Sequence, residues 1–207
     1  MTRPGESAPC LRAELRVPTA SRMRALGRRL APMLRAGDLI VLNGQLGAGK
    51  TTLVRGIGEG LDVRGPVTSP TFVIARVHPA LGGGPALVHV DAYRLSSPAE
   101  VDDLDLDADL ERSVTVVEWG GGLVEGLAAS WLDVTIVMPA PGQGTGQVAT
   151  GGPGSGSGPG SAGERGTGDE SDPGDEPRIV LLTGRGERWA VAAESVRAGL
   201  LGVPVSE

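Results

Sequence analysis

An eight-residue phosphate-binding pattern constrains the fold of this chain more than any other feature. Residues 44–51 read GQLGAGKT, which matches the pattern G-x-x-x-x-G-K-[ST]. The apolar run Leu39–Leu42 before it is typical of a buried parallel strand, and residues 51–60 after it are expected to form a helix. A strand, a glycine-rich loop and a helix in this order predict a nucleoside triphosphate site.

The only lysine of the chain lies in this pattern, at position 50, and the other 18 of the 19 basic residues are arginines. Lysine carries a compact ammonium on a slim stem, whereas arginine ends in a planar fork. We therefore expect Lys50 to reach the β- and γ-phosphates, and Thr51 to offer its hydroxyl to Mg²⁺. Gly44, Gly47 and Gly49 allow the backbone to curl, so that its N–H groups point at phosphate oxygens.

Two further stretches combine a short, mostly apolar strand with a carboxylate at its end. Residues 87–90 are followed by Asp91, and residues 114–117 by Glu118. Ligands of open parallel sheets bind beyond the carboxyl ends of the strands, so both acids are expected to face the same crevice as the phosphate-binding loop. Either acid can hold Mg²⁺ or its waters, and these patterns leave open which is nearer the metal.

The whole pattern predicts the α/β class: a P-loop NTPase-like three-layer sandwich with a mostly parallel central sheet and an antiparallel C-terminal hairpin. We expect further strands at 11–17, 72–77, 131–138 (as an edge strand) and 178–182. We expect a helix capped by Thr19 and running to about residue 34, and further helices over 98–110 and 123–129. Residues 189–196 are apolar enough to return to the core.

Residues 139–177 have a composition that cannot support a packed core. Thirteen of these 39 residues are glycine, six are proline and four are serine. We expect a disordered acidic insert that enlarges the hairpin loop between the last two strands, because lengthening a loop adds little to its closure cost. Residues 1–10 are expected to be a flexible tail, and 11–207 a single domain interrupted by this insert.

Charge and cysteine content exclude several classes of protein. The formal net charge of −6 comes mostly from the insert, which carries six acids and one arginine. The rest is nearly neutral, which argues against strong non-specific binding to nucleic acid.

A single cysteine excludes an internal disulfide. No apolar run is long enough to span a bilayer and residues 1–9 lack a signal core, so we expect a cytoplasmic protein without membrane contact.

Two smaller features have more than one interpretation. The segment TSPT at 68–71 places hydroxyls around a proline just before a predicted strand. It fits a loop that senses a γ-phosphate and a simple polar turn equally well. His89 is expected to be a core residue, or to support a neighbouring ligand, rather than to bind a metal itself.

The motifs taken together resemble those of the TsaE (YjeE) family, small bacterial ATPases of tRNA threonylcarbamoyladenosine synthesis. The resemblance rests on four motifs in order: GxLGAGKTT at 44–52, SPTF at 69–72, HxDxYRL at 89–95 and EW at 118–119. It runs from about residue 17 to 138 and resumes weakly from 178. Four ordered motifs are much more specific than the phosphate-binding pattern alone.

This resemblance implies an ATPase that uses Mg²⁺ and is weak when alone. It implies that the protein acts with TsaB, TsaC and TsaD in modifying the adenosine beside the anticodon. In this pathway the protein would bind the TsaB–TsaD complex and hydrolyse ATP to reset that complex. Contact with tRNA would be indirect, through these partners. The implied catalytic residues are Lys50, Asp91 and Glu118. Thr51 and Glu118 would contact Mg²⁺, and Asp91, which is also expected among the metal-binding residues, would be the Walker B-like acid needed for hydrolysis.

The resemblance also assigns the nucleotide contacts. The junction containing Arg16 and Pro18 would lie near the adenine, and Thr71 would line the γ-phosphate side. The phosphates would be cradled by Leu46, Gly47, Ala48, Gly49, Lys50, Thr51 and Thr52.

The chain departs from the family pattern in the insert and in the acid-rich stretch 101–111. For this stretch a solvated helix is preferred over a surface that binds a basic partner.

Two other functions remain open. One is a small-molecule kinase, which needs an arginine-bearing lid, and Arg94 is the only arginine in a motif after the phosphate-binding loop. The other is a nucleotide-dependent binding module without useful turnover.

Overall fold

The computed structural model describes residues 8–104, 106, 110–138 and 177–201. Residues 1–7 of the expected tail therefore lie outside the described residues, and so does the insert apart from Pro177. Four positions of the predicted helix over 98–110, namely 105 and 107–109, also lie outside them, and three of the four are aspartates.

Seven strands of the described part of the chain form one sheet, and helices lie between them along the sequence. The strands are β1 (Leu11–Val17), β2 (Leu39–Gly44), β3 (Ala75–His78), β4 (Ala86–Asp91), β5 (Ser113–Glu118), β6 (Trp131–Val137) and β7 (Arg178–Arg185). The α-helices are α1 (Ala20–Leu30), α2 (Lys50–Gly60), α3 (Pro98–Asp102) and α5 (Glu187–Leu201). Short 3₁₀ helices are η1 (Ala31–Met33), η2 (Ala92–Arg94) and η3 (Glu125–Leu127).

The strand order is β1-β7-β6-β2-β5-β4-β3. The central strands β6, β2, β5 and β4 run parallel to one another, whereas β1, β7 and β3 pair antiparallel with their neighbours. This confirms the predicted fold class, including the antiparallel hairpin of β6 and β7. The prediction that 131–138 is an edge strand is wrong, because β6 lies between β2 and β7. Its alternating pattern arises because Asp133 and Thr135 are only half-buried on one face.

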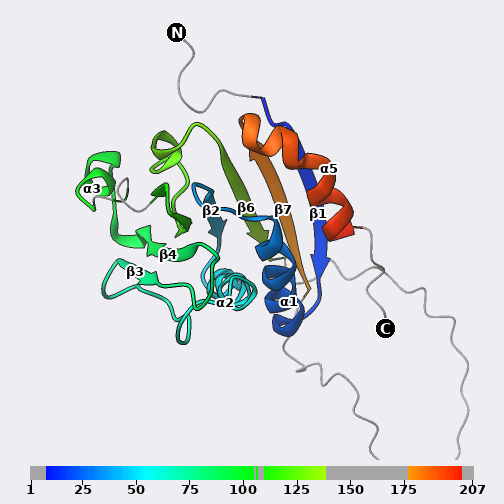
Figure 1. The fold of residues 1–207 in the computed structure, drawn as a ribbon, viewed down its shortest axis with the longest axis horizontal. Helices are drawn as coiled ribbons and strands as arrows, with labels where there is room; N and C mark the ends of the chain where they lie inside the picture. Colours follow the sequence, from blue (N-terminus) through cyan, green and yellow to red (C-terminus); the bar gives the residue numbers. More distant parts are fainter. Residues whose placement is uncertain (1–7, 105, 107–109, 139–176, 202–207) are drawn as a thin grey trace, which may run out of the picture.

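Two apolar clusters cover the two faces of the sheet. The larger one joins the strands to α1, α2 and α5, which lie on one side of the sheet (Figure 1). The smaller one lies on the opposite face, where α3 and loops cover β2, β4 and β5. Alternate residues of β2 serve the two clusters: Ile40 and Leu42 face the helices, and Leu39 and Val41 face the loops. The central strands are buried on both sides, as is typical of parallel sheets.

Helices α1 and α2 approach each other closely because each has a glycine at the contact. A Cβ atom on Gly27 would collide with the backbone of Leu53, and one on Gly56 would collide with the backbone of Arg24. Thr19 caps α1 by accepting a hydrogen bond from the backbone N–H of Arg22 at 3.2 Å, as the sequence predicted. The tight helix pair fixes the start of α1 beside the phosphate-binding loop, where Met23 Cγ lies 3.5 Å from the Cβ position of Gly49.

Three predicted elements are shorter in the structure. The strand expected over 72–77 begins only at Ala75, because the residues before it form a turn in which the N–H of Ile74 donates to the carbonyl of Pro70. The helix expected over 98–110 is interrupted: α3 ends at Asp102, and the described residues 103, 104 and 106 form turns before residue 110 is helical again. The helix expected over 123–129 is reduced to the 3₁₀ turn η3.

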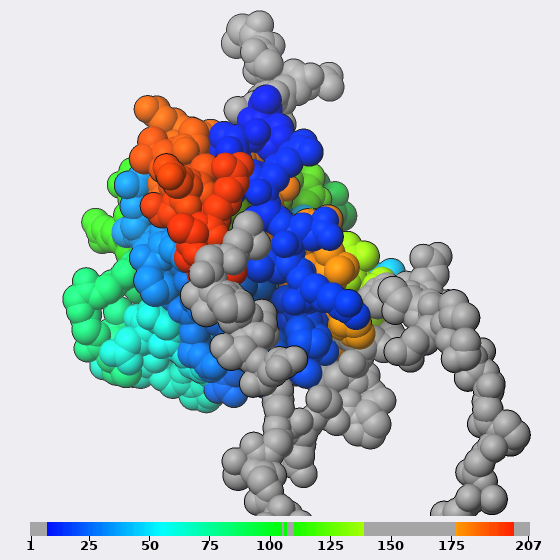
Figure 2. Space-filling model, turned by 90° about the vertical axis from the view of Figure 1, so that its right-hand side faces the viewer, coloured from blue at the N-terminus to red at the C-terminus, as the bar shows by residue number. Residues whose placement is uncertain are grey.

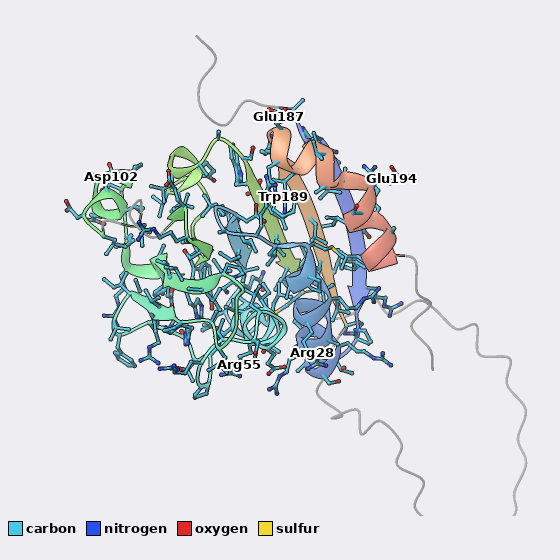
Figure 3. All side chains as sticks on the ribbon, viewed as in Figure 1. Arg28, Arg55, Asp102, Glu187, Trp189 and Glu194 are labelled. Atoms are coloured by element: carbon cyan, nitrogen blue, oxygen red, sulfur yellow. The ribbon has the colours of Figure 1, made fainter. Side chains whose placement is uncertain are left out.

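The C-terminal helix α5 returns to the core as predicted. Trp189 points from α5 towards the sheet and is fully buried, whereas Glu194 points outwards (Figure 3). In the space-filling view the blue strand β1 lies at the surface beside the orange and red helix α5 (Figure 2). Among the described residues, no helix has the length and apolar character needed to cross a membrane.

Candidate functional site

The loop between β2 and α2 has the backbone conformation that the phosphate-binding pattern requires. Gly44, Gly47 and Gly49 have φ angles of 148°, 79° and 106°, a region that favours glycine. Gly49 occupies the N-cap position of α2, so the loop leads directly into the positive end of the helix. Curled backbone of this kind at a helix N-terminus forms a cradle for phosphate groups.

Lys50 is the first residue of α2 and is 5% exposed. Its Nζ donates hydrogen bonds to the carbonyl oxygens of Gly44 (2.9 Å) and Gln45 (3.0 Å). The same ammonium lies over the ring of Trp119, 3.9 Å from its centroid. Burial lowers the pKa of the Lys50 ammonium, and the carboxylates of Glu118 and Asp91 oppose this shift. These two carboxylates favour the charged form of Lys50 that a phosphate group would pair with.

Thr51 and Glu118 bring two oxygen donors together at the start of α2. Thr51 Oγ1 donates a hydrogen bond of 2.8 Å to Glu118 Oε1. Glu118 ends β5, and Asp91 ends the neighbouring parallel strand β4 directly beside it in register. No cluster of three or more His, Cys, Asp or Glu residues among those described is able to hold a metal ion. A hydroxyl and a carboxylate suffice for Mg²⁺ that also binds nucleotide phosphates, so the residues fit this ion.

Asp91 is tied to the hydroxyl-rich segment that precedes β3. Its Oδ2 accepts hydrogen bonds from Thr71 Oγ1 at 2.6 Å and from Ser69 Oγ at 3.3 Å. Its Oδ1 accepts from the backbone N–H of Tyr93 at 3.2 Å, which caps η2. Because of these contacts the segment 68–71 is connected to the acid at the end of β4, which favours the sensor-loop interpretation over an isolated polar turn.

Backbone strain occurs in two segments of the site. Ile74 and Trp119 have φ angles of 66° and 62°, which non-glycine residues rarely adopt, least of all β-branched ones. The N–H of Trp119 donates to the carbonyl of Leu42, so the turn after β5 is pinned to β2 immediately before the phosphate-binding loop. Strain of this kind is often retained where it orients a functional side chain. Here it holds the indole against Lys50.

The remaining predicted contact residues lie around this centre. Thr52 is half-buried in the first turn of α2, while Leu46 at the tip of the loop is 88% exposed and Ala48 is buried. Arg16 and Pro18 are exposed at the end of β1. Both residues precede α1, and Met23 of this helix lies beside Gly49 of the phosphate-binding loop.

Sequence reasoning missed the role of Trp119 as the neighbour of Lys50. It noted that Trp119 follows Glu118, but a cation over an aromatic ring depends on a turn that brings residues 69 positions apart together. Tyr93 adds an edge contact to the same indole, with ring centroids 5.5 Å apart. In the sequence, only the position of Trp119 directly after Glu118, at the end of a predicted strand, could have indicated this contact.

The mostly parallel sheet, the curled loop after β2 and the strand-end acids define the P-loop NTPase class of fold. A family model described as "Threonylcarbamoyl adenosine biosynthesis protein TsaE" matches residues 17–142. The chain belongs to the TsaE family, whose members are named for tRNA threonylcarbamoyladenosine biosynthesis.

Several curated relatives carry the name "tRNA threonylcarbamoyladenosine biosynthesis protein TsaE". The protein from Streptomyces coelicolor is 56% identical over 86% of this chain and 100% of its own length. The Bacillus subtilis protein is 37% identical over 55% of this chain and 70% of its own length. A crystal structure of Bacillus subtilis YdiB superposes with a TM-score of 0.59 at 23% identity, covering 89% of this chain and 93% of that one, and it supports the fold.

Proposed function

We propose that this chain binds ATP with Mg²⁺ and hydrolyses it in the cytoplasm, as the ATPase of tRNA threonylcarbamoyladenosine biosynthesis. The observation that carries the proposal is the grouping of Lys50, Thr51, Asp91 and Glu118 at the mouth of one curled loop. A phosphate chain in this cradle would replace the carbonyl oxygens of Gly44 and Gln45 as the partners of Lys50.

Each acidic residue has its own proposed task. Glu118, fixed next to the Thr51 hydroxyl, would hold Mg²⁺ together with that hydroxyl. The ion, when bound, would supply positive charge beside the phosphate groups. Asp91 would orient the attacking water, because its carboxylate accepts hydrogen bonds at the side of the site where Thr71 lies.

Arg16 and Pro18 are proposed to flank the adenine, and the residues from Leu46 to Thr52 to contact the phosphates. Support for this arrangement comes from Met23, which connects the start of α1 to the end of the loop. Thr71 is proposed to meet the γ-phosphate, which would couple the state of the nucleotide to the segment 69–74 through Asp91.

The proposed partner is the TsaB–TsaD complex, with TsaC in the same pathway and tRNA met only through the partners. An apolar rim around the site supports a protein partner. Phe72 and Tyr93 are 89% and 66% exposed. Val73, which follows Phe72, and Leu46, at the tip of the phosphate-binding loop, are also exposed. Exposed apolar groups gathered around a functional site are typical of protein interaction surfaces.

One experiment tests the proposal against its alternatives. The purified chain is assayed for phosphate release from ATP, alone and with TsaB–TsaD, and for retention by immobilised TsaB–TsaD with and without ATP. We expect slow hydrolysis alone and faster hydrolysis or retention with the partners. Absence of both effects would refute the partner proposal, and phosphate transfer to a small acceptor without water-dependent ATP loss would favour a kinase.

A further inference from the structure

His89 is a fully buried polar residue that none of the proposed tasks uses. It lies on β4 at 0% exposure, opposite Val116 of the neighbouring strand β5. Residues 87, 89 and 91 point to the same face of the sheet because strand side chains alternate. Leu87 and Val116 belong to the apolar cluster on this face, so an apolar side chain would suit position 89 at least as well.

Among the described residues, the imidazole makes one hydrogen-bond contact, and that contact is with the proposed metal-binding carboxylate. His89 Nε2 lies 2.9 Å from Glu118 Oε1. A carboxylate only accepts hydrogen bonds, so Nε2 carries the hydrogen and donates it. The other ring nitrogen, Nδ1, is buried and has no hydrogen-bond partner within the part of the chain that the structure describes. Within the described part of the chain, Glu118 is therefore the one hydrogen-bond partner that orients the ring.

Two donors meet at one oxygen of Glu118. His89 Nε2 donates to Oε1 from the sheet side, and Thr51 Oγ1 donates to the same atom from α2 at 2.8 Å. Oε2 accepts no hydrogen bond from any described residue. Donors on both sides fix the plane of the carboxyl group and leave Oε2 as the oxygen that is available to an incoming cation.

We propose that His89 is a positioning residue, which orients Glu118 through the Nε2–H···Oε1 hydrogen bond so that Oε2 meets Mg²⁺ or its waters. The inference rests on the proposed function, because it assumes that Glu118 serves a nucleotide-bound Mg²⁺. Groups that hydrogen-bond to a metal ligand set its orientation, and their loss typically weakens metal affinity about 10- to 100-fold. His89 acts on the metal only through Glu118 and touches neither metal nor nucleotide.

Two amide variants separate the hydrogen bond from the bulk of the ring. The amide nitrogen of glutamine lies as many bonds from Cβ as Nε2 of histidine does, so His89→Gln keeps a donor within reach of Glu118. The amide nitrogen of asparagine corresponds to Nδ1, so His89→Asn keeps an amide but loses the contact. His89→Leu, which suits the apolar surroundings, replaces His89→Asn in the comparison if asparagine prevents folding.

The test measures the affinity for the ATP analogue AMP-PNP by titration calorimetry, once with MgCl₂ and once with EDTA, after thermal unfolding has shown that each variant is folded. The readout is the ratio of the two dissociation constants. We expect His89→Asn to lower the gain in affinity from Mg²⁺ about 10-fold or more, with little change in EDTA, and His89→Gln to restore most of it.

The other outcomes overturn the inference. An unchanged ratio in His89→Asn would show that the hydrogen bond does not serve the metal. Equal losses with and without Mg²⁺, or an equal defect in folded His89→Gln, would show a purely structural role. Failure of the unaltered chain to bind AMP-PNP at all would refute the proposed function itself, and with it this inference, so the two failures are distinguishable.

Discussion

The ammonium of Lys50 lies 3.9 Å from the centroid of the Trp119 ring, so the phosphate-binding loop and the turn after β5 meet at a single contact. A cation over an indole is stabilised by the ring quadrupole, by about 0.5–2 kcal/mol depending on solvent exposure. Both side chains come from strained or glycine-dependent backbone, which holds them at this spacing.

This contact makes Trp119 a reporter of nucleotide binding. Phosphate groups would draw the Lys50 ammonium away from the indole, so we expect Mg·ATP to change the intrinsic tryptophan fluorescence. Trp131 and Trp189 are 4% and 0% exposed and are expected to give a constant background. Trp119→Phe should abolish the change while retaining most of the affinity. A change of the same size in Trp119→Phe would place the reporter elsewhere.

Asp91→Asn is expected to remove turnover more than binding. The substitution keeps the shape of the side chain but removes the charge that would orient the attacking water, so kcat should fall about 100-fold or more. The dissociation constant for ATP should change much less. Phosphate-release kinetics and calorimetry measure the two quantities. Turnover at the normal rate in Asp91→Asn would contradict this role.

Arg188→Ala is expected to destabilise the fold without affecting the site. Arg188 donates to both carboxylate oxygens of Asp38, at 2.8 and 2.9 Å, and to the carbonyl of Met33 at 2.6 Å. Asp38 is 2% exposed, so removal of Arg188 would leave a buried charge without its ion-pair partner and lower the free energy of unfolding by about 3–5 kcal/mol.

Urea denaturation measures this loss of stability. In the double variant with Asp38→Asn the two effects should sum to less than their separate values, because both residues belong to one contact. A loss under about 1 kcal/mol in Arg188→Ala would show that α5 is held mainly by its apolar face.

Stability is expected to fall below about pH 6.5 because of His78. Burial lowers the pKa of this imidazole from its ordinary value of 6.5. As the pH falls through 6.5, the unfolded chain therefore takes up a proton that the folded chain does not, and the free energy of unfolding decreases, by at most about 1.4 kcal/mol per pH unit. Denaturation at pH 7.5 and 5.5 measures the slope. His78→Leu should flatten it, and an unchanged slope would assign the effect to other groups.

The sequence predicted the parts of the fold that depend on local pattern. The apolar runs before Asp91 and Glu118 became the neighbouring parallel strands β4 and β5, with the two acids in register. It misplaced β6 as an edge strand, because half-buried Asp133 and Thr135 give a central strand the alternation of an exposed one.

The contacts between distant segments could not be predicted in the same way. The hydrogen bond from Thr71 to Asp91 spans 20 residues, and the one from Thr51 to Glu118 spans 67. The first hydrogen bond depends on the turn before β3, and the second depends on the order of the strands in the sheet. The late start of β3 has the same origin, since the tight turn at Pro70–Ile74 ends in a positive φ that no periodicity reveals.

The most direct test of the proposed nucleotide site is the affinity for ATP in the presence of Mg²⁺. Calorimetry determines this affinity for the unaltered chain, Lys50→Ala and Lys50→Arg. Lys50 would contribute charge-assisted hydrogen bonds to the phosphates, so Lys50→Ala should lose about 1.5–3 kcal/mol of binding free energy, roughly 10- to 100-fold in affinity. Lys50→Arg should not restore it, because a planar fork does not fit the cradle. Equal affinity in the unaltered chain and in Lys50→Ala would contradict the assignment of this loop as the nucleotide site.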